Sequence, residues 1–466
     1  MDSVQIETAA SLSLEIPQIV TTSTTPAPAP KPSFRIPKDA IRTSLRASTA
    51  DAVLATGFSI TTSGILLSNF LVELDASPVV FGLLCSIPML VNLIQPLGAY
   101  FSERTTSRFR YSVGIYGTAR LLWLMLAIAI AIFSWEGMSS QQLIWLTLLI
   151  VLASHLLGGL GSASWLSWLA MIVPRRLRGR YFGIRNSAVS LMNLICMPLA
   201  GLGVSHWYGG TIQGYGVVLL VGIVFGIVSI GCQYFKVDIN PQLQNSLGST
   251  STKPNSRDEL VHSPTIPNHS ANSIWKNYNF LIFLIYISLW MFAVHLSAPF
   301  FNLYMLDTLG IDVSWVTVYG SLQAGANLLM LIWWGKLADR VGNLPILIFV
   351  GIMVGLTPIF WLGINANQLD IWLWLPLLHI LAGVTWAAID LCNNNLQLAI
   401  APIKNQSIYF AIAAAVAGGS GALGTTIGSF IAQFSIWGGL LGLFAFSGLL
   451  RLAALVPLFF VQEPGK

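Results

Sequence analysis

Long apolar stretches separated by short polar ones run through nearly the whole chain. Twelve of these stretches are long enough to cross a bilayer, which takes about 20 residues of helix. They cover residues 49–72, 79–101, 111–133, 142–172, 184–206, 216–235, 279–304, 314–337, 344–364, 371–398, 407–432 and 438–461. Inside hydrocarbon the backbone N–H and C=O groups have no water to bond and must hydrogen-bond to one another, so spanning stretches of this length favour helices. The pattern predicts an all-α membrane protein with twelve transmembrane helices.

Two polar segments interrupt or precede this pattern. Residues 1–47 are rich in Thr, Ser, Ala and Pro, a composition that cannot bury a core, so we expect a disordered cytoplasmic tail. Residues 236–277 are rich in Ser, Asn, Pro and Thr and predict a flexible cytoplasmic linker. The linker divides the spans equally, into a six-helix half at 48–235 and a second at 278–462.

The composition agrees with a chain surrounded by lipid. It has 55% hydrophobic and 9% charged residues, whereas soluble proteins carry about a quarter charged residues. The four cysteines lie in apolar stretches without a CxxC pattern, so they predict neither a disulfide framework nor a metal site. We therefore expect the lipid bilayer as the main partner, no cofactor, and a monomer.

The basic residues predict the orientation. Of the 23 Lys and Arg residues, Arg120 and Arg451 lie inside predicted spans, and the other 21 all fall on one side if the N-terminus is inside. Because cytoplasmic loops are rich in Lys and Arg, both termini and the linker are expected in the cytoplasm of a multi-pass plasma (inner) membrane protein. The net charge of +5 then reflects topology and not a nucleic-acid partner.

One polar run between two spans carries a recognisable motif, Gly335-Lys-Leu-Ala-Asp339-Arg340-Val-Gly342. Its charges are costly in hydrocarbon, so the run predicts a tight hairpin at the membrane surface. Asp339 is placed to accept hydrogen bonds at a helix N-terminus. The run resembles the signature loop of the major facilitator superfamily, Gly-x-Leu-Ala-Asp-Arg-x-Gly, found between the second and third helix of each six-helix half.

An internal repeat supports this resemblance. Tyr181-Phe-x-Ile and Tyr409-Phe-x-Ile each follow a proline by seven residues, one in each half, at a spacing of 228 residues. The resemblance implies two pseudo-symmetric halves in the same orientation.

The first-half counterpart of the motif begins at Gly98 and departs from the pattern. Ser102 stands in the place of the aspartate, and Glu103 and Arg104 follow it. Either Glu103 takes the acidic role one residue late, or this hairpin is weaker than its partner.

The resemblance also implies a central cavity lined by the first, fourth, seventh and tenth helices. On the tenth span, polar residues recur at helical spacing along one stripe: His379, Gly383, Trp386, Asp390, Asn393, Asn394 and Gln397. Further cavity candidates on other spans are Thr62, His155, Ser162, His295, Gln323 and Asn327. An alternative stays open for each, because hydroxyls and amides often join helices and a histidine can bond a neighbouring carbonyl.

Two acids are candidates for proton coupling. Asp390 lies deep enough in its span that it is not expected to face lipid, and Asp51 lies at the inner mouth of the first span. The alternative for each is a fixed ion pair, for Asp390 with Arg185 or Lys404. Of the cations within spans, we expect Arg120 to bond carbonyls or an acid, and Arg451 to reach headgroups by snorkelling.

These observations favour a secondary active transporter that moves a small organic solute by alternating access, with protons as a candidate coupling ion. The mostly neutral stripe favours an uncharged, zwitterionic or amphipathic solute. A transport-inactive receptor or scaffold and a membrane-embedded enzyme are the alternatives. The membrane-embedded enzyme is disfavoured, because no HExxH motif, paired acid or nucleophile motif occurs, and no catalytic residue is predicted.

Overall fold

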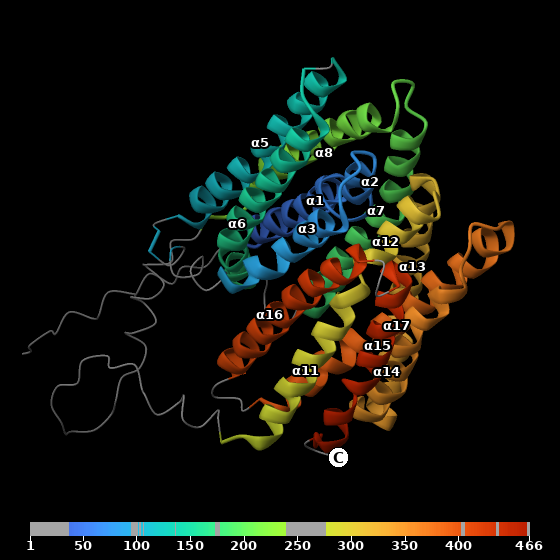
Figure 1. Ribbon diagram of the computed structural model, residues 1–466. Coiled ribbons are helices and arrows are strands. Elements are labelled where there is room, and N and C mark those ends of the chain that lie inside the picture. Colours follow the sequence, from blue (N-terminus) through green and yellow to red (C-terminus); the bar gives the residue numbers. More distant parts are fainter. Residues whose placement is uncertain are drawn as a thin grey trace, which may run out of the picture. The chain divides into compact units, whose positions relative to one another are not determined.

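The computed structural model describes residues 37–94, 101, 104–105, 107–135, 137–172, 178–238, 276–401, 406–434 and 438–463. Within these ranges every regular element is helical (Figure 1). The N-terminal half, residues 38–238, contains α1 (Lys38–Thr62), α2 (Gly64–Val72), α3 (Pro78–Val91), η1 (Asn92–Ile94), α5 (Arg108–Ser134), α6 (Ser140–Ile172), α7 (Arg178–Ser205) and α8 (Thr211–Gln233).

The C-terminal half, residues 276–463, repeats this arrangement. It contains α11 (Tyr278–Ser297), α12 (Phe300–Leu303), η3 (Tyr304–Thr308), α13 (Val313–Val341), α14 (Asn343–Phe360), η4 (Trp361–Gly363), η5 (Asp370–Trp374), α15 (Leu375–Ile400), α16 (Gln406–Gln433), α17 (Gly439–Ala453) and η8 (Val456–Phe460). Eleven described helices are long and apolar enough to cross a membrane, and α3 is a shorter apolar helix. Each of the twelve predicted spans thus contains helix in its described residues, and the twelve-helix prediction is consistent with the structure.

The first helix begins earlier than expected. It starts at Lys38, ten residues before the predicted start at position 48, so the last residues of the predicted tail are helical. Arg42 and Arg46 lie on this extension. The same span is interrupted at Ser63, and α2 resumes at Gly64, whose φ of 64° is accessible to glycine without strain.

The predicted hairpin at the signature motif is also shorter than expected. Helix α13 continues through Arg340 to Val341, and the turn into α14 is made by Gly342 alone. Its φ of 106° lies where side chains are strained, which explains a glycine at this point. The motif is therefore the end of a helix followed by a one-residue turn.

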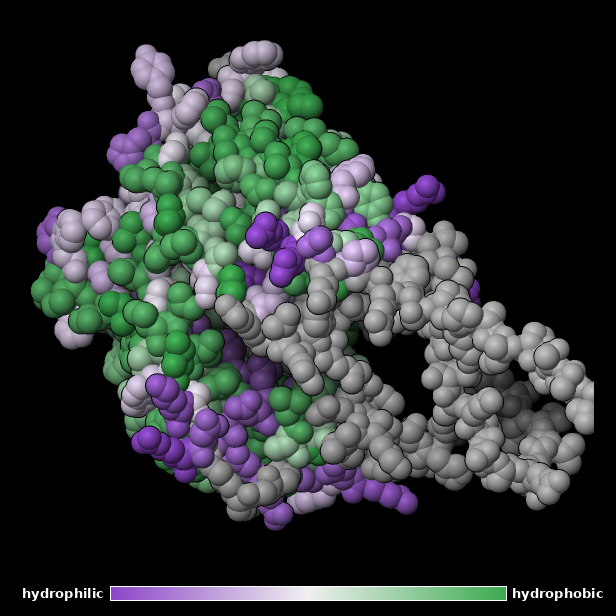
Figure 2. Space-filling view, turned by 180° about the vertical axis from the view of Figure 1, so that it is seen from behind, coloured by the Kyte–Doolittle hydropathy of each residue, from purple (hydrophilic) through white to green (hydrophobic). Residues whose placement is uncertain are grey.

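The outside of the bundle is apolar. Large hydrophobic side chains such as Ile128, Leu149, Leu329 and Ile332 are 60% exposed or more. Figure 2 shows broad apolar areas over the helices, with hydrophilic groups gathered in separate patches and in a hollow between apolar areas. A surface of this kind is expected to face lipid.

The two halves share one apolar core, at one end of the bundle. This core joins α2, α3, α5, α6 and α8 of the N-terminal half with α12, η3 and the start of α13. We call this end, where Asp75 and Asp312 lie, the junction end. The opposite end, where Asp238 and Lys276 lie, is the linker end.

Toward the linker end the C-terminal half has a core of its own. It is built only from residues of α11, α13, α14, α15, α16, α17 and η8 and the residues directly following them. In Figure 1 the two halves meet near α2 and α12 and diverge toward the far ends of α6 and α11. The described packing thus joins the halves at the junction end.

Candidate functional site

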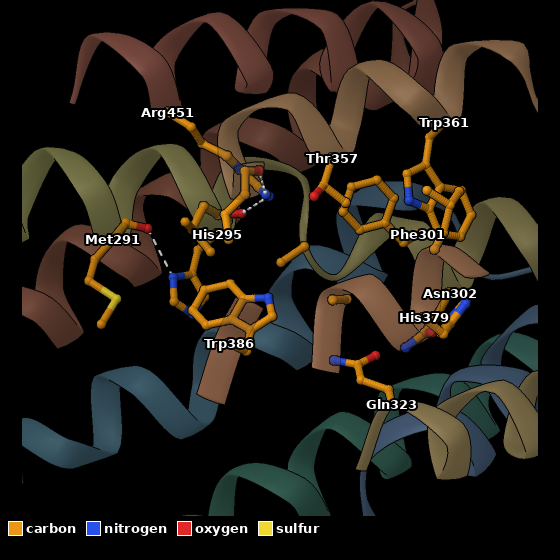
Figure 3. A pocket seen from close by; sticks show the side chains of 15 residues that line it. Met291, His295, Phe301, Asn302, Gln323, Thr357, Trp361, His379, Trp386 and Arg451 are labelled. Carbon is orange, nitrogen blue, oxygen red and sulfur yellow. Dashed lines mark hydrogen bonds between the residues drawn. The ribbon is translucent and has the colours of Figure 1, made fainter. Parts of the chain in front are cut away.

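A cavity of about 390 Å³ lies inside the C-terminal half. Helices α11, α12, α13, α14, α15 and α17 and the η4 turn enclose it (Figure 3). Its lining residues are Met291, Val294, His295, Ala298, Phe301, Asn302, Gln323, Val354, Thr357, Trp361, Leu378, His379, Ala382, Trp386 and Arg451. Of the predicted cavity residues, the structure brings His295, Gln323, His379 and Trp386 together here.

Arg451 is the charged group of this cavity, and the sequence did not predict it there. Arg451 is 2% exposed and lies inside the helix bundle, so the expectation that it snorkels was wrong. Nη1 donates to Val354 O at 3.1 Å, and Nη2 donates to Val294 O at 3.1 Å and to Ser297 Oγ at 2.9 Å. The buried Nε–H has no hydrogen-bond partner among the residues that the structure describes. The guanidinium therefore sits at the meeting point of α11, α14 and α17.

Both cavity histidines have the same local arrangement. His295 Nδ1 lies 2.9 Å from Met291 O, and His379 Nδ1 lies 2.8 Å from Leu375 O. Since a carbonyl oxygen only accepts, each Nδ1 carries the hydrogen, and each neutral ring keeps Nε2 as an acceptor. Each histidine thus bonds a carbonyl of its own helix and also lines this cavity.

Aromatic rings hold the position of His379. Its ring lies 5.3 Å from that of Tyr319 and 5.8 Å from that of Trp361, measured between centroids. Tyr319 is itself fixed by a 2.8 Å hydrogen bond from its hydroxyl to Ile371 O. This side of the cavity is therefore rigid and largely aromatic.

The remaining residues of the predicted stripe line a second pocket. Asp390, Asn393, Asn394 and Gln397 face a space of about 360 Å³ between α11, α15 and α16. Met291 borders both pockets. Since a helix rises about 1.5 Å per residue, Asp390 lies about 6 Å along α15 from Trp386, toward the linker end. Apart from Gly383, which packs against Gln323 of α13, the residues of the predicted stripe thus face two successive pockets within one half.

Asp390 and Asp51 have different surroundings. Within the described residues the Asp390 side chain is exposed and makes no ion pair, so pairing with Arg185 finds no support, and Lys404 lies outside the description. Asp51 accepts from Lys236 Nζ at 2.6 Å and also from Ser229 Oγ. Burial lowers the pKa of the Lys236 ammonium, although Asp51 opposes this effect. For Asp51 the structure favours the fixed ion pair.

The other cavity candidates lie elsewhere. Thr62 is buried and donates to Phe58 O at 3.0 Å, within its own helix. His155 on α6 and Asn327 on α13 are half-buried and border neither pocket described above. The side chain of Ser162 lies outside the described residues. Arg120 meets its expectation, because its Nη1 donates to Gly226 O at 2.5 Å.

The signature motif does not cap the helix that follows it. Asp339 and Arg340 are exposed, and the N-terminus of α14 is capped by Glu463 instead. The carboxylate of Glu463 accepts from Asn343 N at 3.1 Å, Leu344 N at 3.1 Å and Asn343 Nδ2 at 2.7 Å. The prediction that Asp339 accepts these bonds was therefore wrong.

An equivalent cap occurs in the first half. Asp238 accepts from Phe109 N at 3.1 Å and from Ser107 Oγ at 2.5 Å, at the start of α5. In both halves an acid after the sixth span binds the start of the third. Gly98 and Glu103 of the first-half motif lie outside the described residues, and Arg104 lies in an exposed turn.

Specific contacts join the halves near the junction end. Ser86 Oγ lies 3.3 Å from Thr426 Oγ1, and Ser205 Oγ donates to Asp312 Oδ2 at 2.5 Å. Asp312 also accepts from Ser314 N at 2.8 Å, at the start of α13. Burial alone would raise the pKa of Asp312, but the hydrogen bonds from Ser205 and Ser314 outweigh it and hold that pKa below its ordinary value.

Apolar lipid-facing helices in two like halves, with a partly polar cavity between helices, define a polytopic membrane protein of the solute-carrier class. The sequence matches the Major Facilitator Superfamily over residues 52–396. The chain belongs to this family.

Related proteins support the same assignment. A curated relative, the multi-drug resistance efflux pump PmrA homolog of Lactococcus lactis subsp. lactis (strain IL1403), is 33% identical over 174 residues. The alignment covers 36% of this chain and 40% of that protein, so it spans well under half of either.

Solved structures share the fold. The D-xylose-proton symporter matches with a TM-score of 0.68 at 15% identity, covering 91% of this chain and 99% of that one. The nucleoside transporter NupG matches with a TM-score of 0.61 at 12% identity, covering 91% and 98%.

Proposed function

We propose that the protein is a secondary active transporter that moves a small organic solute by alternating access of its two halves. The observation that carries the proposal is the uneven packing between the halves. One apolar core joins them at the junction end, while the linker-end core belongs to the C-terminal half alone. With the linker end in the cytoplasm, as the basic residues predict, this arrangement corresponds to an inward-facing state.

Changing state would require the junction-end contacts to separate. Two helix pairs, α3 with α16 and α7 with α13, carry most of them, and α2 also packs against α12 and α13. Small residues permit close approach in both pairs, because a side chain at Gly82 would meet Ser429 and one at Gly201 would meet Thr317. Hydroxyl contacts such as Ser86–Thr426 are weak enough to be broken and remade.

A disulfide across the halves tests this mechanism. In a protein whose four native cysteines are replaced, Ser86→Cys and Thr426→Cys would place two thiols where the hydroxyl oxygens are 3.3 Å apart. Oxidation should stop solute flux in proteoliposomes, and reductant should restore it. The two single-cysteine proteins, treated identically, are the controls. Unchanged flux in the oxidised, fully cross-linked protein would count against alternating access.

Asp390 is the proposed proton-coupling residue. Its carboxylate faces the second pocket without an ion-pair partner in the described part of the chain, and an unpaired acid at membrane depth is a functional candidate. We expect Asp390→Asn to abolish the pH dependence of uptake or efflux while leaving the protein folded. The same pH profile in wild type and variant would remove this role. The matched control is Asp39→Asn, an exposed acid on α1.

A further inference from the structure

The cavity in the C-terminal half carries a positive charge without an internal counter-charge. We propose that it binds the carboxylate of a small organic acid with an aromatic or other apolar body, and that Arg451 is the carboxylate ligand. This inference rests on the proposed function, with the further premise that the transported solute occupies this cavity. It replaces the sequence-based expectation of an uncharged, zwitterionic or amphipathic solute with a solute that carries a carboxylate.

The charge of Arg451 is not neutralised by its neighbours. Three of its five N–H groups donate to neutral acceptors, two carbonyl oxygens and the Ser297 hydroxyl. Its buried Nε–H has no partner in the described part of the chain. Within the described ranges Arg451 makes no ion pair, and no acid is among the residues that line the cavity.

A buried charge of this kind favours an anion. Neutral acceptors satisfy hydrogen bonds but leave the charge unpaired, and an unpaired ion away from water is strongly unfavourable. A guanidinium matches a carboxylate in geometry, because two parallel N–H groups can bind both oxygens. Figure 3 shows the Arg451 side chain extending from its helix toward His295, at the border of the cavity.

The rest of the lining predicts the body of the solute. Phe301, Trp361 and Trp386 provide aromatic surface, and Met291 and Leu378 add apolar surface. The volume of about 390 Å³ lies at the small end of the range for small-molecule sites. A single flat ring with a short acidic side chain fits both the volume and the aromatic lining.

The main alternative is that Arg451 only joins helices. Its bonds to Val294, Val354 and Ser297 do connect α17 to α11 and α14. That role accounts for the hydrogen bonds but not for a full charge at the edge of a cavity. The experiment must therefore detect the charge and not only the loss of the side chain.

Phenylacetate and its amide, phenylacetamide, are suitable probes because they have nearly the same shape and differ in charge. A bound ligand stabilises the folded state by mass action. We expect phenylacetate to raise the unfolding temperature of the purified full-length protein in detergent in a saturable way, and phenylacetamide to have no such effect. Equal shifts with both compounds would overturn the inference.

Two variants locate the site. Arg451→Gln should lose the phenylacetate shift, but it can also fail to fold because it removes contacts to three helices. Thr357→Asp instead adds an internal carboxylate to the cavity wall, on the helix that also carries Val354. It should raise the stability of the ligand-free protein and abolish the phenylacetate shift. Thr357→Asn, nearly the same in size but neutral, is the matched control, and identical behaviour of the Asp and Asn proteins would overturn the inference.

Chloride and inorganic phosphate distinguish a free anion from an organic acid. If either alone reproduces the phenylacetate shift, the cavity is an inorganic anion site and the organic-acid assignment falls. Flux in proteoliposomes separates this inference from the proposed function. Charge-dependent phenylacetate binding without flux would support the carboxylate site and count against transport. Transport of a solute that lacks a carboxylate, equally fast in wild type and Thr357→Asp, would support transport and overturn the carboxylate site.

Discussion

The buried ion pair between Asp51 and Lys236 provides the sharpest quantitative prediction. The two side chains are 4% and 2% exposed, and Nζ lies 2.6 Å from Oδ2. Ser229 Oγ donates to the other carboxylate oxygen. The perturbation consists of Asp51→Asn, Lys236→Met and the double variant, each close in size to the original residues.

The expected magnitudes follow from the balance between attraction and desolvation. At an effective dielectric constant near 20, unit charges about 2.6 Å apart attract each other by about 6 kcal/mol, whereas burying each ion costs several kcal/mol. The net contribution of the ion pair to the free energy of unfolding is therefore close to zero. Either single variant removes the counter-charge of one buried ion and should lower the free energy of unfolding by about 3–5 kcal/mol. The loss of free energy of unfolding in the double variant should be at least about 2 kcal/mol smaller than the sum of the two single losses.

Reversible unfolding in detergent measures all three variants against wild type. The control is Asp39→Asn, which removes an exposed pair with Arg42 at 3.7 Å, and should have no measurable effect. Single variants within about 1 kcal/mol of wild type, or losses that simply add in the double variant, would refute this reasoning. Flux assays add a second criterion, because a lost pH dependence in the double variant would move the coupling role from Asp390 to Asp51.

Further predictions concern the linker end and the junction end. Glu463→Gln should destabilise the protein by about 1 kcal/mol through a weaker cap on α14, measured by unfolding in detergent. Asp339→Asn should leave stability unchanged but reduce flux, and a stability loss equal to that of Glu463→Gln would contradict the cap assignment. Gly201→Leu should force α7 away from Thr317 on α13 and lower the yield of the Ser86–Thr426 cross-link without reducing membrane insertion. Because the folded-state pKa of Asp312 lies below its ordinary value of 3.8, its contribution to stability is present above that value and is lost as the pH falls through the lowered pKa. The stability difference between wild type and Asp312→Asn should accordingly shrink in acid, and a difference that is constant with pH would contradict it.

The helices could be predicted from the sequence because hydrocarbon imposes a strong constraint. A spanning segment must be apolar and must satisfy its own backbone, and both conditions are visible in twelve stretches. The start of α1 at Lys38 was not visible in the same way. Arg42 and Arg46 can lie on a helix that extends beyond the membrane, and hydropathy marks only the part that crosses it.

The site was predictable only in part, for a different reason. The polar stripe with His379 and Trp386 is evident on one helix, since its residues are close in sequence. Arg451 was misassigned because an almost uniformly apolar helix gives no sign of which face turns inward. Glu463 was missed because its contact with Asn343 joins residues 120 positions apart, which no local pattern records.

The matching caps change how the signature motif is understood. In each half an acid beyond the sixth span, Asp238 or Glu463, binds the first turn of the third span. The start of α14 is therefore satisfied without Asp339, which is exposed on the last turn of α13. Because Asp339 makes no capping bond in the described state, its charge is available for contacts in another state. The signature motif is exposed at the linker end, where the two halves diverge. Contacts that hold the two halves together when that end closes would form there. In the described state the caps thus hold the start of the third span of each half, and we propose that the charges of Asp339 and Arg340 act between the halves when the linker end closes.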